Sequence, residues 1–137
     1  MRPTILVVGC ANMAYVFGKL RHIPDHDVYH VYGDEALRLA KTLGSPIALV
    51  VTEPFHPLHS GIDPAVSDNG ISAGPLLIHD LRQLRPETTF ILLNASPEQE
   101  RLISHDQVLF VQAPDFWKLG SLQTIVEHHL HLLPVAA

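Results

Sequence analysis

The chain has little of several residue types on which whole classes of protein depend. Its 137 residues include one Cys, which excludes an internal disulfide and fits a reducing compartment. Nine Lys and Arg stand against fourteen Asp and Glu, and the net charge of −5 argues against direct contact with nucleic acid. No hydrophobic run approaches the ~18 residues of a membrane span, and no signal-peptide core follows the N-terminus. These absences predict a cytoplasmic protein with no direct role at a membrane or on nucleic acid.

What the sequence does contain fits one globular domain. Hydrophobic residues make up 47% of the chain and charged residues 17%, which are ordinary fractions for a globular protein. A chain of this length buries roughly 65–70% of its unfolded surface, so one core is enough without covalent crosslinks. We therefore expect residues 1–137 to form a single domain.

Five short apolar runs recur along the chain. They are continuous rather than alternating and rich in Val and Ile, a pattern typical of strands buried on both faces of a parallel sheet. The predicted strands are residues 5–8, 28–32, 47–51, 90–93 and 108–111.

Patterns with helical periodicity lie between these runs. The predicted helices are residues 13–21, 34–44, 73–86, 97–103 and 120–133. In the third of them, Leu77, Leu81 and Leu84 are expected on one buried side. Strands that alternate with helices predict an α/β fold, a three-layer sandwich around a parallel sheet. Right-handed crossovers favour the flavodoxin-like strand order 2-1-3-4-5.

In that order, ligands bind where the first and third strands end. Residues 54–75 interrupt the alternation, and their Pro and Gly content predicts a long loop beside this site. The residues expected at the strand tips are Gly9, Cys10, Glu53, Asn94 and Ala113.

Five stretches of the sequence carry a resemblance to a known family, one of which, "LLIHDLRQLRPETTFILLNAS", resembles the family's third helix and fourth strand. The stretch "ILVV" resembles the family's first strand, and "GDEALRLA" resembles the start of its second helix. In "EPFHP", an acidic residue is followed four positions later by Pro, as around the family's phosphoacceptor Asp, and "LFVQAPDF" resembles its fifth strand and Lys-Pro-Phe motif. The family is the response-regulator receiver domain, and the resemblance covers nearly the whole chain. It implies a CheY-like fold and a role in two-component signal transduction.

The residues that carry receiver chemistry are replaced at each matching position. Receivers hold Mg²⁺ with two acids after the first strand, phosphorylate an Asp on the third, and contact the phosphoryl group with a Thr or Ser and a Lys. Here Gly9 and Cys10 replace the acids, Glu53 the phosphoacceptor, Asn94 the hydroxyl and Ala113 the Lys. We therefore expect a degenerate receiver, a pseudo-receiver that is not an enzyme, holds no metal or cofactor, and acts independently of phosphorylation.

Two positions that match functional positions of receivers have two interpretations each. Glu53 either imitates the charge of a phosphorylated Asp or lies at a solvated strand end. Phe110 matches the position of an aromatic residue that switches in receivers, and is otherwise a core residue of a buried strand. The sequence leaves both pairs open.

The resemblance also implies a surface for protein–protein interaction, formed by the last helix, the fourth helix and the fifth strand. Phe116, Trp117 and Leu119 follow the fifth strand as candidate anchors, although Trp117 equally fits packing under the last helix. The expected partner is a signalling or output protein, or a second copy of this chain. The loop at residues 54–75 is a second candidate surface.

The alternative function is a sensor that binds a small ligand or nucleotide in the pocket at the strand ends. The stretch "GCANMA" fits a relaxed dinucleotide-binding fingerprint with one of three Gly in place. His56 and His59 have metal-like spacing, but a zinc site needs three or four rigid ligands. These and the other His residues, His30 included, are therefore expected to be solvated.

Overall fold

Five parallel strands form the sheet around which the molecule is built. The structure is a computed structural model that describes residues 2–9, 13–54, 73–104, 106–112 and 121–130. The strands are β1 (Thr4–Val8), β2 (Asp27–Val31), β3 (Ile47–Thr52), β4 (Thr89–Leu93) and β5 (Val108–Val111). Their order is β2-β1-β3-β4-β5, with every neighbouring pair parallel. The predicted strand order is confirmed.

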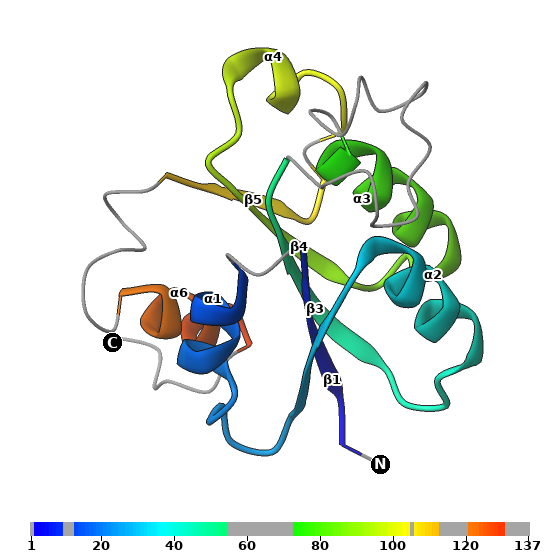
Figure 1. Cartoon of the computed structure of the whole chain (residues 1–137), viewed down its shortest axis with the longest axis vertical. Coiled ribbons are helices and arrows are strands. Elements are labelled where there is room, and N and C mark those ends of the chain that lie inside the picture. Colours follow the sequence, from blue (N-terminus) through cyan, green and yellow to red (C-terminus); the bar gives the residue numbers. More distant parts are fainter. Residues whose placement is uncertain (1, 10–12, 55–72, 105, 113–120, 131–137) are drawn as a thin grey trace.

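Helices cover both faces of this sheet. They are α1 (Met13–Leu20), α2 (Gly33–Thr42), α3 (Ala73–Leu84), α4 (Pro97–Glu100) and α6 (Ser121–His129). Figure 1 shows α1 and α6 on one side of the sheet and α2 and α3 on the other, so the molecule has the three predicted layers. None of the described helices has the length and apolar content needed to span a membrane.

The central strands β1, β3 and β4 are continuous apolar runs because they are buried on both faces, whereas the predicted burial on both faces is wrong for the edge strand β2, in which exposed and half-buried residues alternate before a buried Val31. Ile5 and Val7 pack in one cluster with residues of α1 and α6, while Leu6 and Val8 pack in another with residues of α2 and α3. All four side chains are fully buried. Each such burial contributes about 1.5–3 kcal/mol, so the two clusters fix which face each helix covers.

The predicted helix at residues 97–103 is too long, and the predicted loop at 54–75 runs too far, into the helix predicted from residue 73. Helix α4 ends at Glu100 rather than at residue 103, because Leu102 N donates to Gln99 O and the chain tightens and leaves the helix. Helix α3 begins at Ala73, so the last three residues of the predicted loop at 54–75 are helical. Residues 55–72 of that loop lie outside the described residues.

The predicted burial of the third helix is partly wrong. Leu77 and Leu81 are buried, but Leu84 is 38% exposed. Leu84 is the last residue of α3 and lines a cavity beside the loop that follows the helix. In α6, Val126 is buried and Ile125 is half-buried.

Candidate functional site at the carboxyl ends of the strands

The carboxyl ends of the central strands meet at one edge of the sheet, as the strand order predicts. Val8 pairs with Thr52 and Thr52 with Leu92, so the residues that follow β1, β3 and β4 are neighbours. We call Gly9, Thr52, Glu53 and Asn94 the rim. Of the five predicted strand-tip residues, the structure brings three together, while Cys10 and Ala113 lie outside the described residues.

Gly9 is required at the end of β1 by both its backbone and its surroundings. Its φ of +153° lies in a region that other residues rarely adopt. A Cβ at this position would stand 2.6 Å from Cγ of the buried Met13. The position matching one of the two receiver acids therefore has no room for a side chain unless Met13 moves.

The carboxylate of Glu53 lies against this glycine. Its Oε1 is 3.5 Å from the place where a Cβ of Gly9 would stand. Glu53 is half-buried, so the charge lies in the rim rather than fully in solvent. The space that a second carboxylate would occupy in a metal site is thus bordered by Glu53 and filled in part by Met13.

A second glycine sets the position of the helix that follows. A Cβ on Gly74 would stand 2.8 Å from Cα of Pro54 and would overlap the backbone carbonyl of Glu53. Gly74 N also donates to Pro54 O at 2.8 Å. The first turn of α3 therefore packs directly on the backbone at the end of β3. Gly74 falls both in the predicted loop at 54–75 and in the predicted helix at 73–86, and neither prediction indicates this close approach.

Thr52 is the buried residue of the rim, and its side chain bonds to the neighbouring strand. Its side chain is fully buried, and its Oγ1 donates to Val8 O at 2.9 Å. This bond joins β3 to β1 through a side chain, beyond the ladder between the two strands. A buried hydroxyl with a partner costs little, whereas the same group without one would be destabilising.

His30 connects the edge strand β2 to the rim, contrary to the prediction that the His residues are solvated. Its ring is half-buried and stacked on Phe17, with centroids 6.0 Å apart. Nε2 lies 3.2 Å from Gly9 O, and because a carbonyl oxygen can only accept, Nε2 carries the proton in this contact. The sequence spacing of His30 gave no indication of this contact, which depends on the pairing of β2 with β1.

Asn94 ends β4 with a left-handed backbone. Its φ is +58°, which Asn tolerates better than most residues, and its N donates to Val111 O at 2.8 Å. Its side chain is exposed. Ser96, the next hydroxyl along the chain, accepts from Gln99 N at 3.2 Å as the cap of α4. Ser96 is thus engaged in starting a helix.

Phe110 is half-buried and packs against the cluster beneath α2 and α3. This position is compatible with a core role, and it leaves the switching interpretation untested. Phe116, Trp117 and Leu119 lie outside the described residues, as do His56 and His59. Among the residues that the structure describes, no group of three His, Cys, Asp or Glu is placed to hold a metal ion.

No family model matches the chain, and no curated protein sequence matches it significantly. Solved structures do match. The signal receiver domain of an HD domain-containing protein from Pseudomonas fluorescens Pf-5 aligns with a TM-score of 0.61 and 22% identity, over 96% of this chain and 91% of that one. A CheY-like response regulator receiver domain from Methylobacillus flagellatus aligns with a TM-score of 0.59 and 20% identity, over 94% and 99%.

The response regulator domain of CheB from Thermotoga maritima also aligns, with a TM-score of 0.54 and 17% identity over the whole of both chains. These structural alignments establish the fold and, because the identities are this low, nothing beyond it. The chain has the CheY-like flavodoxin fold, and receiver domains are among its structural neighbours.

Proposed function

We propose that this chain is a receiver-like signalling domain that acts through protein contacts without a phosphorylation step. The shared fold of the receiver domains supports the signalling role. The absence of a phosphorylation step is inferred from Gly9, where an added side chain would meet Met13 and where the Glu53 carboxylate lies close by.

Phosphoryl transfer to a carboxylate needs a cation that neutralises the charge developing on the transferred group. Gly9 offers a metal ion no side chain, and its carbonyl already accepts from His30. Glu53 is one methylene longer than the usual nucleophile, and Ser96 is engaged in capping α4. These features favour a domain whose state is fixed or is set by a binding partner.

The test is incubation with acetyl phosphate and Mg²⁺, followed by intact-mass spectrometry, and with beryllofluoride and Mg²⁺, followed by fluorine NMR. We expect no adduct in either experiment, while a receiver with its full acid pair, run in parallel, is modified. A stoichiometric adduct at Glu53 would contradict the proposal. The double substitution Gly9→Asp with Glu53→Asp tests whether restoring the acids is enough to restore the chemistry.

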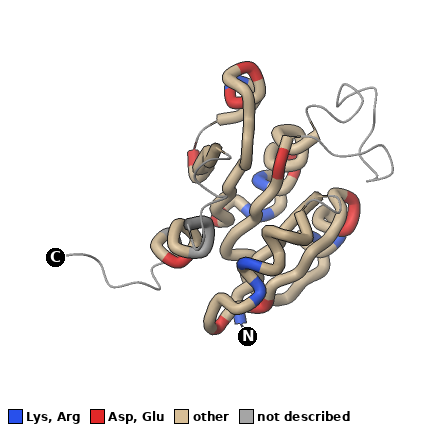
Figure 2. Tube along the Cα trace, turned by 60° about the vertical axis from the view of Figure 1, so that its left-hand side comes forward, with Lys and Arg blue, Asp and Glu red and all other residues tan. Residues whose placement is uncertain are grey.

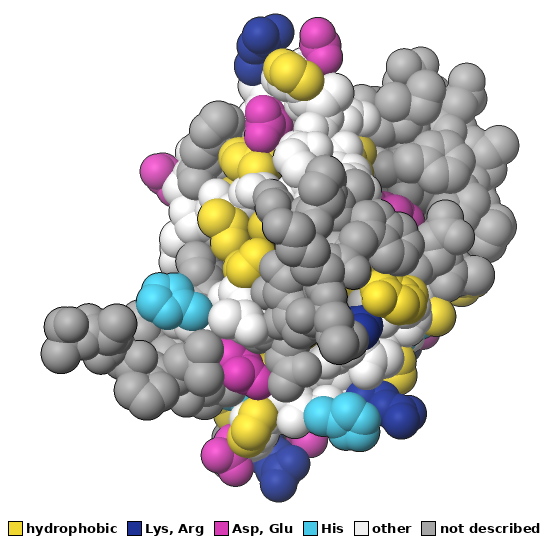
Figure 3. All heavy atoms as spheres, turned by 90° about the vertical axis from the view of Figure 1, so that its left-hand side faces the viewer, with side chains coloured by type: hydrophobic (Ala, Val, Ile, Leu, Met, Phe, Trp, Pro, Cys, Tyr) yellow, Lys and Arg dark blue, Asp and Glu magenta, His cyan; other side chains and the backbone are white. Residues whose placement is uncertain are grey.

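The proposed contact surface lies at the β5 edge of the sheet. We define the β5 surface as Leu102, Ile103, Val108 and Phe110. Leu102 is 59% exposed, and the other three are half-buried. Figure 3 shows hydrophobic side chains on this face of the molecule, beneath the charged turn of α4. Apolar groups that reach the surface together, with charges at their border, are typical of a site that another protein covers.

The charge distribution favours a protein partner. In the described part of the chain, Lys and Arg are scattered among the Asp and Glu, and no described element carries a stripe of basic residues alone (Figure 2). Binding to nucleic acid would need such a stripe. A second copy of this chain and another signalling protein both remain within the proposal.

Sedimentation velocity over a range of concentrations, with the wild type and two variants, tests this surface. If the partner is a second copy, Leu102→Asp weakens self-association at least about tenfold, because a charge is placed in the apolar contact. Tyr29→Asp is the matched control, since Tyr29 is a 43% exposed residue on the opposite edge strand, β2. Equal effects of the two substitutions would contradict the assignment of the contact to the β5 surface.

A further inference from the structure

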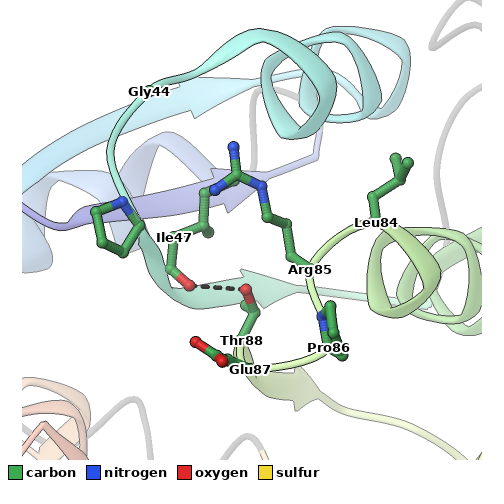
Figure 4. A pocket seen from close by; sticks show the side chains of 8 residues that line it. Gly44, Ile47, Leu84, Arg85, Pro86, Glu87 and Thr88 are labelled. Atoms are coloured by element: carbon green, nitrogen blue, oxygen red, sulfur yellow. Dashed lines mark hydrogen bonds between the residues drawn. The ribbon is translucent and has the colours of Figure 1, made fainter.

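A cavity opens at the opposite edge of the sheet, where the strands begin. It has a volume of about 320 Å³ and lies between the loop joining α2 to β3 and the loop joining α3 to β4 (Figure 4). This size is at the lower end of the range for small-molecule sites. We call it the amino-end cavity. Its lining residues are Gly44, Pro46, Ile47, Leu84, Arg85, Pro86, Glu87 and Thr88.

The guanidinium of Arg85 is held in place beside this cavity. Nε donates to Ala40 O at 2.9 Å, one terminal nitrogen to Ser45 O at 3.1 Å, and the other to Leu43 O. These carbonyls belong to the end of α2 and the loop after it, so the side chain is rigid before any ligand arrives. A guanidinium has five N–H donors, and the two that remain have no partner among the described residues.

The carboxylate of Glu87 supplies an opposite charge on the same cavity. Arg85 and Glu87 stand two positions apart on one turn, closed by Thr88 N donating to Arg85 O at 3.1 Å. Figure 4 shows the Arg85 side chain crossing toward the α2–β3 loop and Glu87 directed to the other side of Thr88. Glu87 is exposed, and its carboxylate has no partner among the described residues.

The balance of charge selects against a simple anion. The end of α2 carries about half a negative charge, and its carbonyls are in contact with the guanidinium. Together with Glu87, this leaves the cavity close to neutral or slightly negative despite Arg85. Phosphate or another dianion is therefore disfavoured, whereas a molecule with both a carboxylate and an ammonium group meets complementary charges on two walls.

The remaining walls are apolar. Leu84 is 38% exposed at the end of α3, and Pro46 and Pro86 are rigid rings on the two loops. Below them, Thr88 Oγ1 donates to Ile47 O at 2.7 Å, so the polar groups of the floor are already satisfied. An aliphatic body would cover Leu84 and the proline rings without leaving a buried polar group unpaired.

We propose that the amino-end cavity binds a small zwitterion with an aliphatic body, of the amino-acid type. The carboxylate accepts from the two remaining donors of Arg85, the ammonium group pairs with Glu87, and the aliphatic part contacts Leu84. The site lies at the far edge of the sheet from the rim, so the inference is independent of the proposed function.

Titration of the isotopically labelled chain, followed by the amide signals of residues 44–47 and 84–88 in nitrogen–proton correlation spectra, tests the proposal. With L-leucine as the probe, we expect saturable shifts with a Kd on the order of 1 mM. 4-Methylvalerate, which is leucine without the ammonium group, and isoamylamine, which is leucine without the carboxylate, bind at least about threefold more weakly. Shifts that do not saturate, or phosphate binding more tightly than leucine, would overturn the proposal.

Two substitutions in the walls sharpen the test. Glu87→Gln weakens leucine binding about threefold and does not weaken the binding of 4-methylvalerate, because it removes the partner of the ammonium group alone. Leu84→Ala weakens both probes, because it removes the apolar contact. Glu98→Gln, which changes an exposed carboxylate on α4, is the control and leaves all affinities unchanged. Equal effects of Glu87→Gln and Glu98→Gln would overturn the assignment.

Discussion

The two edges of the sheet are built by opposite means. At the amino edge, long side chains cross between loops, and Arg85 and Thr88 donate to carbonyls 40 to 45 positions away in the sequence. At the rim, neighbouring groups occupy the space that a side chain would need at Gly9 and at Gly74 of the adjoining helix α3. Side-chain hydrogen bonds therefore fix the amino edge. The rim has two such bonds, from Thr52 and His30, and depends in addition on the space that Gly9 and Gly74 leave for neighbouring groups.

The largest expected effect comes from the amino edge. Arg85→Ala removes three hydrogen bonds and leaves the carbonyls at the end of α2 without a charged donor. We expect the free energy of unfolding to fall by about 3 kcal/mol, measured by urea denaturation. Arg38→Ala, at an exposed position on α2, is the control and changes stability by less than about 0.5 kcal/mol. Similar losses from both substitutions would show that Arg85 does not fix this edge.

The matching test at the rim is Gly74→Ala. The new Cβ would overlap the backbone of Glu53 and Pro54, so α3 must shift, and we expect a loss of about 2 kcal/mol in the same assay. Gly18→Ala is the control, since a Cβ on Gly18 meets nothing within 4 Å. Because Gly18 lies within α1, that control raises stability by about 0.5–1 kcal/mol. The comparison fails if the two substitutions change stability in the same direction.

A smaller effect tests whether one type of bond is equivalent at both edges. Thr52 donates to Val8 O at the rim, and Thr88 donates to Ile47 O at the amino edge, and both residues are buried. Replacing either Thr by the isosteric Val leaves one buried carbonyl without that donor, at a cost of about 1 kcal/mol each. Thermal unfolding of Thr52→Val and Thr88→Val measures this. A difference above about 1 kcal/mol would show that the two edges relax differently.

The smallest effect on stability is expected for Glu53→Gln. The side chain keeps its size and position against Gly9 and loses its charge, so stability changes by less than about 0.5 kcal/mol. If the charge imitates a phosphorylated Asp, the same substitution changes the affinity for a partner at the β5 surface by at least about threefold. Sedimentation velocity of wild type and variant, beside Glu98→Gln as a charge control, separates this from the interpretation as a solvated strand end.

The fold could be predicted because its signals are local and repeated. Apolar runs such as residues 47–51 are continuous, and "DEALRLAKTLG" has the period of a helix. The pattern that predicts each element therefore lies within the residues of that element. The ends of elements were harder to predict. Helix α4 stops at Glu100 although the helical pattern continues to residue 103, because the bond from Leu102 N to Gln99 O tightens the chain, and Ile103 beyond it packs against the cluster beneath α2 and α3.

The sequence predicted which residues lie at the candidate site, but not the contacts between them. The strand order predicted from the sequence places Gly9, Glu53 and Asn94 at one edge of the sheet, and the structure has that order. Neither the contact of His30 with Gly9 O nor the approach of Gly74 to Pro54 has a signal in sequence spacing. Both depend on how separate elements pack against each other.

By itself, the sequence determined the five strands, the helices between them and the parallel order of the sheet, because burial on two faces demands apolar residues along the central strands β1, β3 and β4. The tertiary structure alone decided that Gly9 has no room for an acid, that Arg85 closes the end of α2, and that a cavity opens between two loops. Local patterns encode which residues are buried. The distances between groups far apart in the chain arise from the packing of whole elements, which no local pattern records.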